Sequence, residues 1–467
     1  MSLSPGMQGL GLDQAPPLPI PFLFFAVAPV ALVVAGLLLL DHGSAALATG
    51  WHPTTLTLTH LGTLGFLGSV MFGAVYQMSP VVAVAPVPWI RHAYAVWGMH
   101  AVGLAMLVMW GAPGIGGLSG SPWLSFHFLA TGIMLFACLV GWALWRSKAG
   151  GATVWGMRVA VTSLFLAMTM GTFMVGYWSD GASMLGIDRV LALETHIGLA
   201  VFGWIGCLLV AVSWQVVPMF YLTPEVEGEH SWILVLTLAA SVAGVLCVLL
   251  VAVVLGLAGG IPAGLVEGGR LTSAILLAPA AVALWVVHPW IILRKLRQRR
   301  RRRVDPSAHF WVTGMLLGPL TLFLAVSTVL RSSDWYGLAF VWCALIGWAG
   351  FVVHGMLTRI GPFLVWFHRF SPLVGIVETP PMRRMLSDRM VWLGYGFHMA
   401  ALVLGLFAIS LHVDDPAEAP NLYVAVDWAA RGAGAALVGF GCVLGHHLWT
   451  LWRLRPDEGA AGLVGPA

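Results

Sequence analysis

Twelve long apolar stretches constrain the fold of this chain more than any other feature of its sequence. A helix needs roughly 20 predominantly apolar residues to cross the hydrocarbon core of a bilayer. Of all residues 59% are hydrophobic and 9% are charged, whereas soluble domains carry about 25% charged residues. The sequence therefore predicts an all-α polytopic membrane protein and excludes an ordinary soluble or disordered chain. The stretches lie at residues 21–40, 54–80, 92–111, 122–145, 153–177, 188–221, 231–257, 271–293, 308–330, 336–366, 388–411 and 421–452.

Lysine and arginine predict the orientation of the chain. The loops after the fourth, eighth, tenth and twelfth stretches all carry basic residues, the longest run being Arg299–Arg303. The positive-inside rule places this side, and both termini, in the cytoplasm of a bacterial inner membrane. We expect a cytoplasmic segment at 1–20, a single membrane domain of 12 helices at 21–453 and a cytoplasmic tail at 454–467. We expect the arginine run to anchor the topology, and the alternative is that it binds anionic lipid or a partner. Because the net charge of +4 comes mostly from this run, the sequence does not indicate nucleic-acid binding.

A G-x-x-G motif recurs in the second, sixth and tenth stretches. In each copy a proline follows the second glycine by twelve residues. This spacing predicts three pseudo-repeats of four helices around a pseudo-threefold axis, although small residues also recur in membrane helices because they let helices approach each other. The copies are Gly65–Gly68 with Pro80, Gly203–Gly206 with Pro218, and Gly347–Gly350 with Pro362.

Histidine is the conspicuous polar residue of the apolar stretches. Ionisable groups inside a membrane are costly and therefore indicate function, and imidazole suits iron, copper and zinc. The alternative for any single histidine is a hydrogen bond between helices. The spacings are not those of a soluble zinc site, so ligands must converge from different helices. The membrane histidines are His60, His100, His127, His196, His288, His354, His398, His446 and His447.

The predicted depths divide the candidate ligands into two layers. His60, His127 and His196 belong to the outer layer, whereas His100, His354, His398 and His447 belong to the inner layer. If the repeats share depth, His60 and His354 differ by twelve residues, or about 18 Å, so His354 is better matched by His398 across the hairpin of the tenth and eleventh stretches. Two layers suit two haems, or one metal site with structural histidines. Arg359 is a candidate anchor for a haem carboxylate, or reaches cytoplasmic water.

The residues resemble a known family. Twelve stretches, three repeats and membrane histidines, with residues 59–62 (THLG), 76–80 (YQMSP) and 362–370 (PFLVWFHRF), are similar to divergent relatives of subunit I of the haem–copper oxidase superfamily. That superfamily includes the nitric oxide reductases, and NnrS-like membrane proteins are a comparable relative. The resemblance implies an oxidase subunit I-like fold with one or two haem b groups and, as a further candidate, copper.

The same resemblance implies roles for two histidines. His60 matches the ligand of the low-spin haem, and His196 stands where a copper ligand lies. The tenth stretch holds His354 alone where the family has two histidines, residues 231–257 hold none, and residue 200 is alanine in place of a tyrosine. The usual copper-site histidines are therefore missing, and no catalytic residue is assigned.

We expect a haem-binding integral membrane redox protein that acts in electron transfer or in reduction of a small diatomic such as NO or O2. It would be an oxidoreductase of the oxidase or nitric oxide reductase type. Its expected partners are a cytochrome c-type or cupredoxin electron donor or a quinol, and a further membrane subunit. The alternative function is a non-catalytic haem or copper transporter or sensor.

Overall fold

A computed structural model describes residues 14–112, 121–176, 188–226, 228–258, 263–300, 305–331, 333–411 and 419–456. Within these ranges the chain is helical apart from loops and one isolated bridge, and 12 helices are long and apolar enough to cross a membrane. The predicted multi-pass, all-α architecture is confirmed. Most of the expected terminal segments, 1–20 and 454–467, lies outside the described residues, as does part of the arginine run.

The observed spans agree with the predicted stretches to within a few residues at most boundaries. They are Pro19–Leu47, Pro53–Val82, His92–Gly111, Pro122–Arg146, Ala152–Met174, Arg189–Tyr221, Gly228–Gly256, Gly268–Arg297, Pro306–Leu330, Asp334–Leu373, Asp388–Ser410 and Pro420–Arg453. Proline, which is favoured in the first helical turn because its missing N–H has no partner there anyway, begins five of them. The first span is longer than predicted because α1 (Pro19–His42) continues through Gly43 into the 3-10 helix η3 (Gly43–Leu47).

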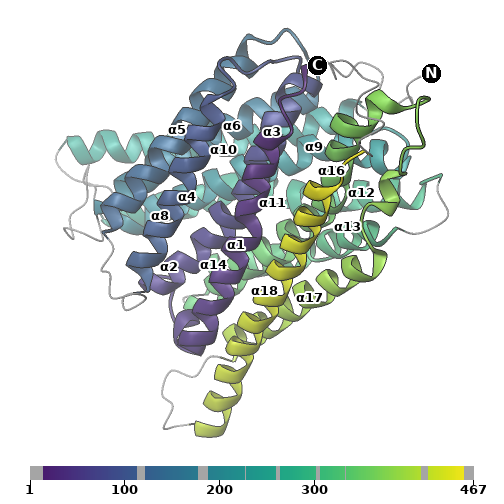
Figure 1. The fold of residues 1–467 in the computed structure, drawn as a ribbon. Coiled ribbons are helices and arrows are strands. Elements are labelled where there is room, and N and C mark those ends of the chain that lie inside the picture. Colours follow the sequence, from purple (N-terminus) through teal and green to yellow (C-terminus); the bar gives the residue numbers. More distant parts are fainter. Residues whose placement is uncertain are drawn as a thin grey trace. The chain divides into compact units, whose positions relative to one another are not determined.

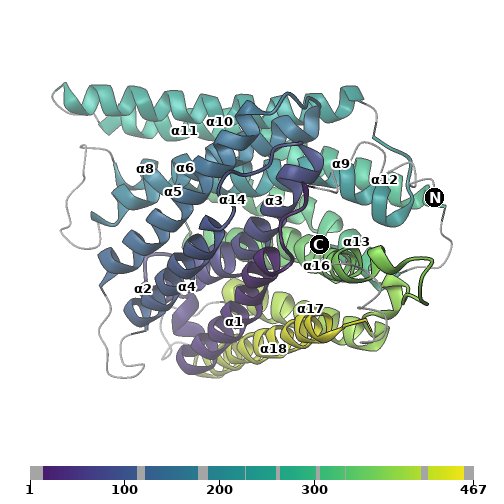
Figure 2. The same ribbon diagram turned by 45° about the horizontal axis from the view of Figure 1, so that its top comes forward.

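Contacts divide the chain into two compact units. Unit 1 comprises Tyr76–Arg302 and Met315–Ser332, and in it α10 and α11 run side by side (Figure 2). Its helices are α4 (His92–Gly111), α5 (Pro122–Arg146), α6 (Ala152–Met174), α8 (Arg189–Ile197), η6 (Gly198–Gly206), α9 (Cys207–Tyr221), α10 (Gly228–Leu257), α11 (Ala263–Val282), η7 (Ala283–Val287), α12 (His288–Arg297) and α14 (Gly318–Leu330).

Unit 2 comprises Pro16–Val75, Arg303–Gly314 and Ser333–Ala467. The boundary between the units falls inside α3 (Ser69–Val82) and inside the span formed by α13 (Pro306–Leu316) and α14. The other helices of unit 2 are α1, η3, α2 (Pro53–His60), η4 (Leu61–Gly68), α15 (Asp334–Trp342), η8 (Cys343–Ala349), α16 (Gly350–Val365), η9 (Trp366–Phe370), the short η10 (Ser371–Leu373) and η11 (Met382–Arg384), α17 (Asp388–Ser410) and α18 (Pro420–Arg453).

Unit 2 joins the two ends of the chain, because α1 and α18 lie side by side in it (Figures 1 and 2). Glycine lets their backbones touch. A Cβ on Gly36 would lie 2.5 Å from the carbonyl oxygen of Gly434, and a Cβ on Gly434 would lie 2.6 Å from that of Gly36. Close approach of small residues is how helices gain van der Waals contact in lipid. The pairing of the first and last helices therefore depends on these glycines.

The three G-x-x-G motifs coincide with a shared distortion of the backbone. The segments η4, η6 and η8 are all π-helical, with i→i+5 hydrogen bonds, and each contains all or most of one motif. π-Helical turns are rare and occur frequently at functional sites. Two further π-helical segments, η7 and η9, lack the motif, so the distortion is not limited to the repeat and the four-helix pseudo-repeat stays a prediction.

Replacing Gly434 by alanine tests the α1–α18 contact. We expect Gly434→Ala to destabilise the protein by about 1–3 kcal/mol, because its Cβ forces two backbones apart. The matched control is Gly396→Ala on α17, where a Cβ meets nothing within 4 Å and alanine should be neutral or stabilising by up to about 1 kcal/mol. Thermal unfolding in detergent measures both, and equal midpoints would contradict the contact.

Candidate functional site

The buried histidine pair of unit 2 is the most organised polar feature in the apolar interior of that unit. His354 on α16 and His398 on α17 are both 0% exposed. Their Nδ1 atoms lie 3.1 Å apart, in a hydrogen bond between the two rings. The structure thus brings the two histidines into contact across the hairpin, while their role as ligands stays a prediction.

The direction of the hydrogen bonds fixes the protonation of both rings. His398 Nε2 lies 2.7 Å from the carbonyl oxygen of Ile346, and because a carbonyl only accepts, Nε2 carries the proton. A neutral imidazole has one N–H, so His398 Nδ1 is the acceptor and His354 Nδ1–H donates to it. His354 Nε2 is therefore an unprotonated nitrogen, and it is buried with no hydrogen-bond partner among the described residues.

Phenylalanine rings hold the pair in place. His398 is sandwiched between Phe351, with centroids 4.0 Å apart and planes 7° apart, and Phe440, at 4.4 Å and 14°. His354 contacts Phe440 and Phe310, each with centroids 4.4 Å away. Because both nitrogens of His398 are hydrogen-bonded and its faces are covered, His398 orients His354 rather than offering a nitrogen of its own.

The surroundings of His354 Nε2 include an unusually small residue. A Cβ on Gly394 of α17 would lie 3.4 Å from this nitrogen, so a side chain at that position would cover it.

His447 of α18 is also buried, 3% exposed, and neither of its ring nitrogens has a hydrogen-bond partner within the described ranges. No group of three His, Cys, Asp or Glu side chains in this part of the chain has the geometry of a complete metal site.

The pair does not fit as the two axial ligands of one haem. Metal–imidazole bonds are about 2.0–2.1 Å long, so two nitrogens on opposite sides of one iron stand about 4 Å apart with a porphyrin between them. Here His354 and His398 are in direct hydrogen-bond contact at 3.1 Å and Phe351 and Phe440 cover both faces of His398. Of the four ring nitrogens of the pair, His354 Nε2 is the one without a hydrogen-bond partner among the described residues.

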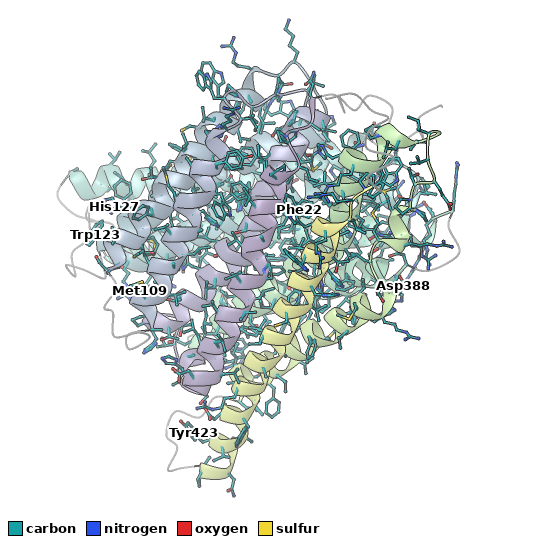
Figure 3. All side chains as sticks on the ribbon, in the orientation of Figure 1. Phe22, Met109, Trp123, His127, Asp388 and Tyr423 are labelled. Carbon is teal, nitrogen blue, oxygen red and sulfur yellow. The ribbon has the colours of Figure 1, made fainter. Side chains whose placement is uncertain are left out.

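The predicted outer-layer histidines each bind a backbone carbonyl. His60 lies in unit 2, where its Nδ1–H donates to the carbonyl of Leu56 at 2.8 Å. His127 and His196 lie in unit 1. His127 is exposed on α5 (Figure 3) and donates to its own helix, whereas His196 of α8 donates to Ala167 of α6 at 2.9 Å. The Nδ1–H bonds leave Nε2 of each ring unprotonated, the form that metals bind.

The remaining predicted residues occupy separate places. His100 is buried on α4 of unit 1. Arg359 of α16 forms an ion pair with Asp305, and its Nε donates to Ser307 at 3.0 Å. Its guanidinium is thus engaged by residues directly before and within α13. Within unit 2 the structure brings His354 and His398 into direct contact.

Sequence reasoning gave no role to His288, which it counted among the membrane histidines, and did not predict a tyrosine–histidine pair in unit 1. Ser213 donates to Val210 and accepts from His288 Nε2 at 2.9 Å, and Tyr76 donates to His92 Nε2 at 3.0 Å. The signal available for His92 was its place at the start of α4, the helix that follows the one carrying Tyr76.

Comparison with known proteins assigns no function to these residues. Neither the known protein families nor the curated proteins contain a match to the chain. The resemblance to oxidase subunit I stays a prediction from the sequence.

The Arg359–Asp305 ion pair can be tested against an exposed one. We expect Arg359→Ala to destabilise the protein by about 1–3 kcal/mol, because it leaves a part-buried carboxylate without its cation. The matched control is Arg383→Ala, whose ion pair with Asp388 is 3.5 Å long and largely exposed, so its loss should cost less than about 1 kcal/mol. Thermal unfolding midpoints of the two variants measure the difference. If Arg359→Ala instead loses bound haem without a change in stability, Arg359 would be an anchor for a haem carboxylate.

Proposed function

We propose that this chain is an integral membrane redox protein that binds haem iron or copper at His354 Nε2. It acts in electron transfer or in the reduction of a small diatomic such as NO or O2, as an oxidoreductase. The observation that carries the proposal is a buried, unprotonated imidazole nitrogen whose tautomer is fixed by hydrogen bonds and which lacks a hydrogen-bond partner among the described residues.

The hydrogen-bonded chain behind His354 supports a ligand role. Metal-ligating histidines almost always donate their other N–H to a carbonyl or a carboxylate, which fixes the ring and raises its basicity. His354 donates to His398, and His398 donates to the Ile346 carbonyl.

The residues around the pair supply the environment that redox chemistry needs. The bound haem or copper would supply one-electron chemistry, which the protein's own side chains lack. Phe310, Phe351 and Phe440 exclude water from the rings, and a dry shell tunes the potential of a metal. His398 keeps the proton on His354 Nδ1 and so keeps Nε2 available.

The finer architecture and the partners belong to the same proposal. The G-x-x-G motifs, each lying in or next to a π-helical segment (η4, η6 and η8), support three pseudo-repeats in an oxidase subunit I-like fold through their equal spacing to proline. Electrons would come from a cytochrome c-type or cupredoxin donor or a quinol, with a further membrane subunit as a partner. The setting would be a bacterial inner membrane with both termini in the cytoplasm.

A second candidate function is a non-catalytic haem or copper transporter or sensor. The engagement of the other candidate imidazoles favours it: His60, His127 and His196 each bind a backbone carbonyl through Nδ1 and would suit transient ligands. The two functions differ in whether iron or copper stays bound to the purified protein.

Removing the proposed ligand tests the function directly. We expect purified wild-type protein to carry about one haem or copper per chain through an imidazole ligand, and His354→Ala to lose it. Pyridine-haem absorbance and metal analysis give the ratio. His127→Ala, which removes an exposed histidine, is the control and should keep the wild-type content.

Two outcomes would contradict the proposal. If His354→Ala and His127→Ala retain equal haem and metal, His354 is not the ligand. Colourless wild-type protein that releases copper readily on washing would replace the redox function by the transporter or sensor.

The positioning role of His398 generates a separate expectation. His398→Phe keeps a flat ring between Phe351 and Phe440 but removes the acceptor for His354 Nδ1–H. Loss of such an outer hydrogen bond typically weakens metal binding about 10–100-fold. Titration of the stripped variant with haem and with Cu(I) measures the affinity, and an unchanged dissociation constant would show that the tautomer of His354 is set elsewhere.

A further inference from the structure

The two unpaired ring nitrogens of His447 carry an inference that deepens the proposed function. His447 lies on α18 and is 3% exposed, yet neither of its nitrogens has a hydrogen-bond partner in the described part of the chain. The large majority of buried polar side chains are hydrogen-bonded, so an unpaired one indicates a role such as binding an ion. His354 Nε2 is a second buried nitrogen of this kind in the same unit.

One face of α18 connects His447 with the histidine pair. Phe440, Val443 and His447 follow one another at spacings of three and four residues, so they share one face of the helix. The ring centroid of Phe440 lies 4.4 Å from that of His354, and His354 and His447 interact electrostatically. The side of α18 that packs against His354 therefore also carries His447.

The position of Gly394 on α17 shows how closely His354 Nε2 approaches this face. A Cβ on Gly394 would lie 3.4 Å from His354 Nε2 and 3.2 Å from Val443 Cγ1. His354 Nε2 is thus near Val443, which lies about one helical turn before His447. Residues one turn apart have Cβ atoms about 5–6 Å from each other, a distance that a histidine side chain can span. The unpaired nitrogens of the two histidines are therefore placed to share one small ligand.

We propose that His354 Nε2 and one ring nitrogen of His447 together bind a single Cu(I) ion in two-coordinate geometry. The inference rests on the proposed function, in which His354 Nε2 is a metal ligand, and adds the second ligand and the identity of the ion. His354 Nε2 is already unprotonated, and a neutral imidazole at His447 also has one unprotonated nitrogen. Neither ring has to lose a proton when the ion binds.

The number of available ligands selects Cu(I) among the metals that imidazole binds. Zn²⁺ takes four ligands in structural sites and Cu²⁺ takes a tetragonal set, whereas the filled d shell of Cu(I) allows two imidazoles in a line. Over the ranges that the structure describes, no group of three His, Cys, Asp or Glu side chains could hold a metal ion. A haem between the two rings would need room for a porphyrin, but a Cβ on Gly394 would already be within 3.4 Å of side chains from both α16 and α18.

A Cu(I) titration of two neighbouring histidine variants tests the proposal. The purified, metal-free full-length protein is titrated anaerobically with Cu(I) in competition with the chelator bicinchoninate, which gives the affinity. We expect one Cu(I) per wild-type chain and an affinity lowered by more than about 100-fold in His447→Ala, since loss of an outer hydrogen bond alone costs about 10–100-fold. His446→Ala removes an exposed imidazole at the preceding position and, as the matched control, should keep the wild-type affinity.

X-ray absorption at the copper edge measures the coordination of the ion. We expect two nitrogen neighbours at about 2.0 Å in the wild type. In His447→Met a thioether, itself a ligand of Cu(I), replaces the imidazole, so copper should stay bound with one nitrogen and one sulfur neighbour. A purely structural role of His447 predicts no sulfur signal. Because methionine fills more of the space than alanine does, His447→Met also serves as the test if His447→Ala does not fold.

The outcomes separate this inference from the proposed function. If His354→Ala releases Cu(I) while His447→Ala binds it as tightly as His446→Ala does, His447 is not a ligand and the proposed function stands. If His354→Ala also binds Cu(I) at wild-type affinity, this inference fails, and unchanged haem content in the same variant would overturn the proposed function as well. Wild-type protein that retains haem but binds no Cu(I), or copper with more than two neighbours, would overturn the two-coordinate Cu(I) site alone.

Discussion

Inside a bilayer no water satisfies the polar groups of the protein, so each N–H and C=O must find its partner within the fold. In this chain the constraint extends from the backbone to the histidines. The hydrogen bond from His398 Nε2 to the Ile346 carbonyl joins a helix side chain to a π-helical segment. That one bond sets which nitrogen of His398 accepts and, through it, which nitrogen of His354 stays unprotonated. The protonation of His354 therefore depends on a backbone carbonyl two rings away.

The π-helical segments and the glycines serve the same packing problem in different ways. A π turn inserts an extra residue into a helix and redirects the backbone groups around it, which suits a helix that must present a carbonyl to a neighbouring side chain. Glycine removes the side chain where backbones or rings come close, as Gly434 does against Gly36 and Gly394 does against His354. The conspicuous glycine content of the sequence has two separate uses, close helix contact and room beside a buried nitrogen.

Helix positions could be predicted from the sequence because span length is set by bilayer thickness, a property of the solvent rather than of tertiary packing. The His354–His398 contact could also be predicted, since consecutive helices form a hairpin and equal distances from its turn give equal depths. The orientation of the pair could not, because Ile346, Phe351 and Phe440 are ordinary apolar residues whose roles arise only from packing. For the same reason the involvement of Arg359 with Asp305 escaped prediction, since depth alone does not tell a haem carboxylate from an aspartate at the end of a neighbouring helix.

The aromatic rings packed on His354 bear on what it would hold under the proposed function. The rings in contact with His354 are His398 and the phenylalanines Phe310 and Phe440, none of which carries a negative charge. A divalent ion bound there by a neutral imidazole would keep its charge uncompensated in a low dielectric, which is strongly unfavourable. Cu(I) brings half that charge, and ferrous haem brings none in total, because the porphyrin supplies two negative charges to its iron. Within the proposed function, the electrostatics of the site thus favour Cu(I) or haem over Zn²⁺ or Cu²⁺. Oxidation of the bound metal would add one positive charge to the apolar interior, and the free energy of burying that charge opposes the oxidised state.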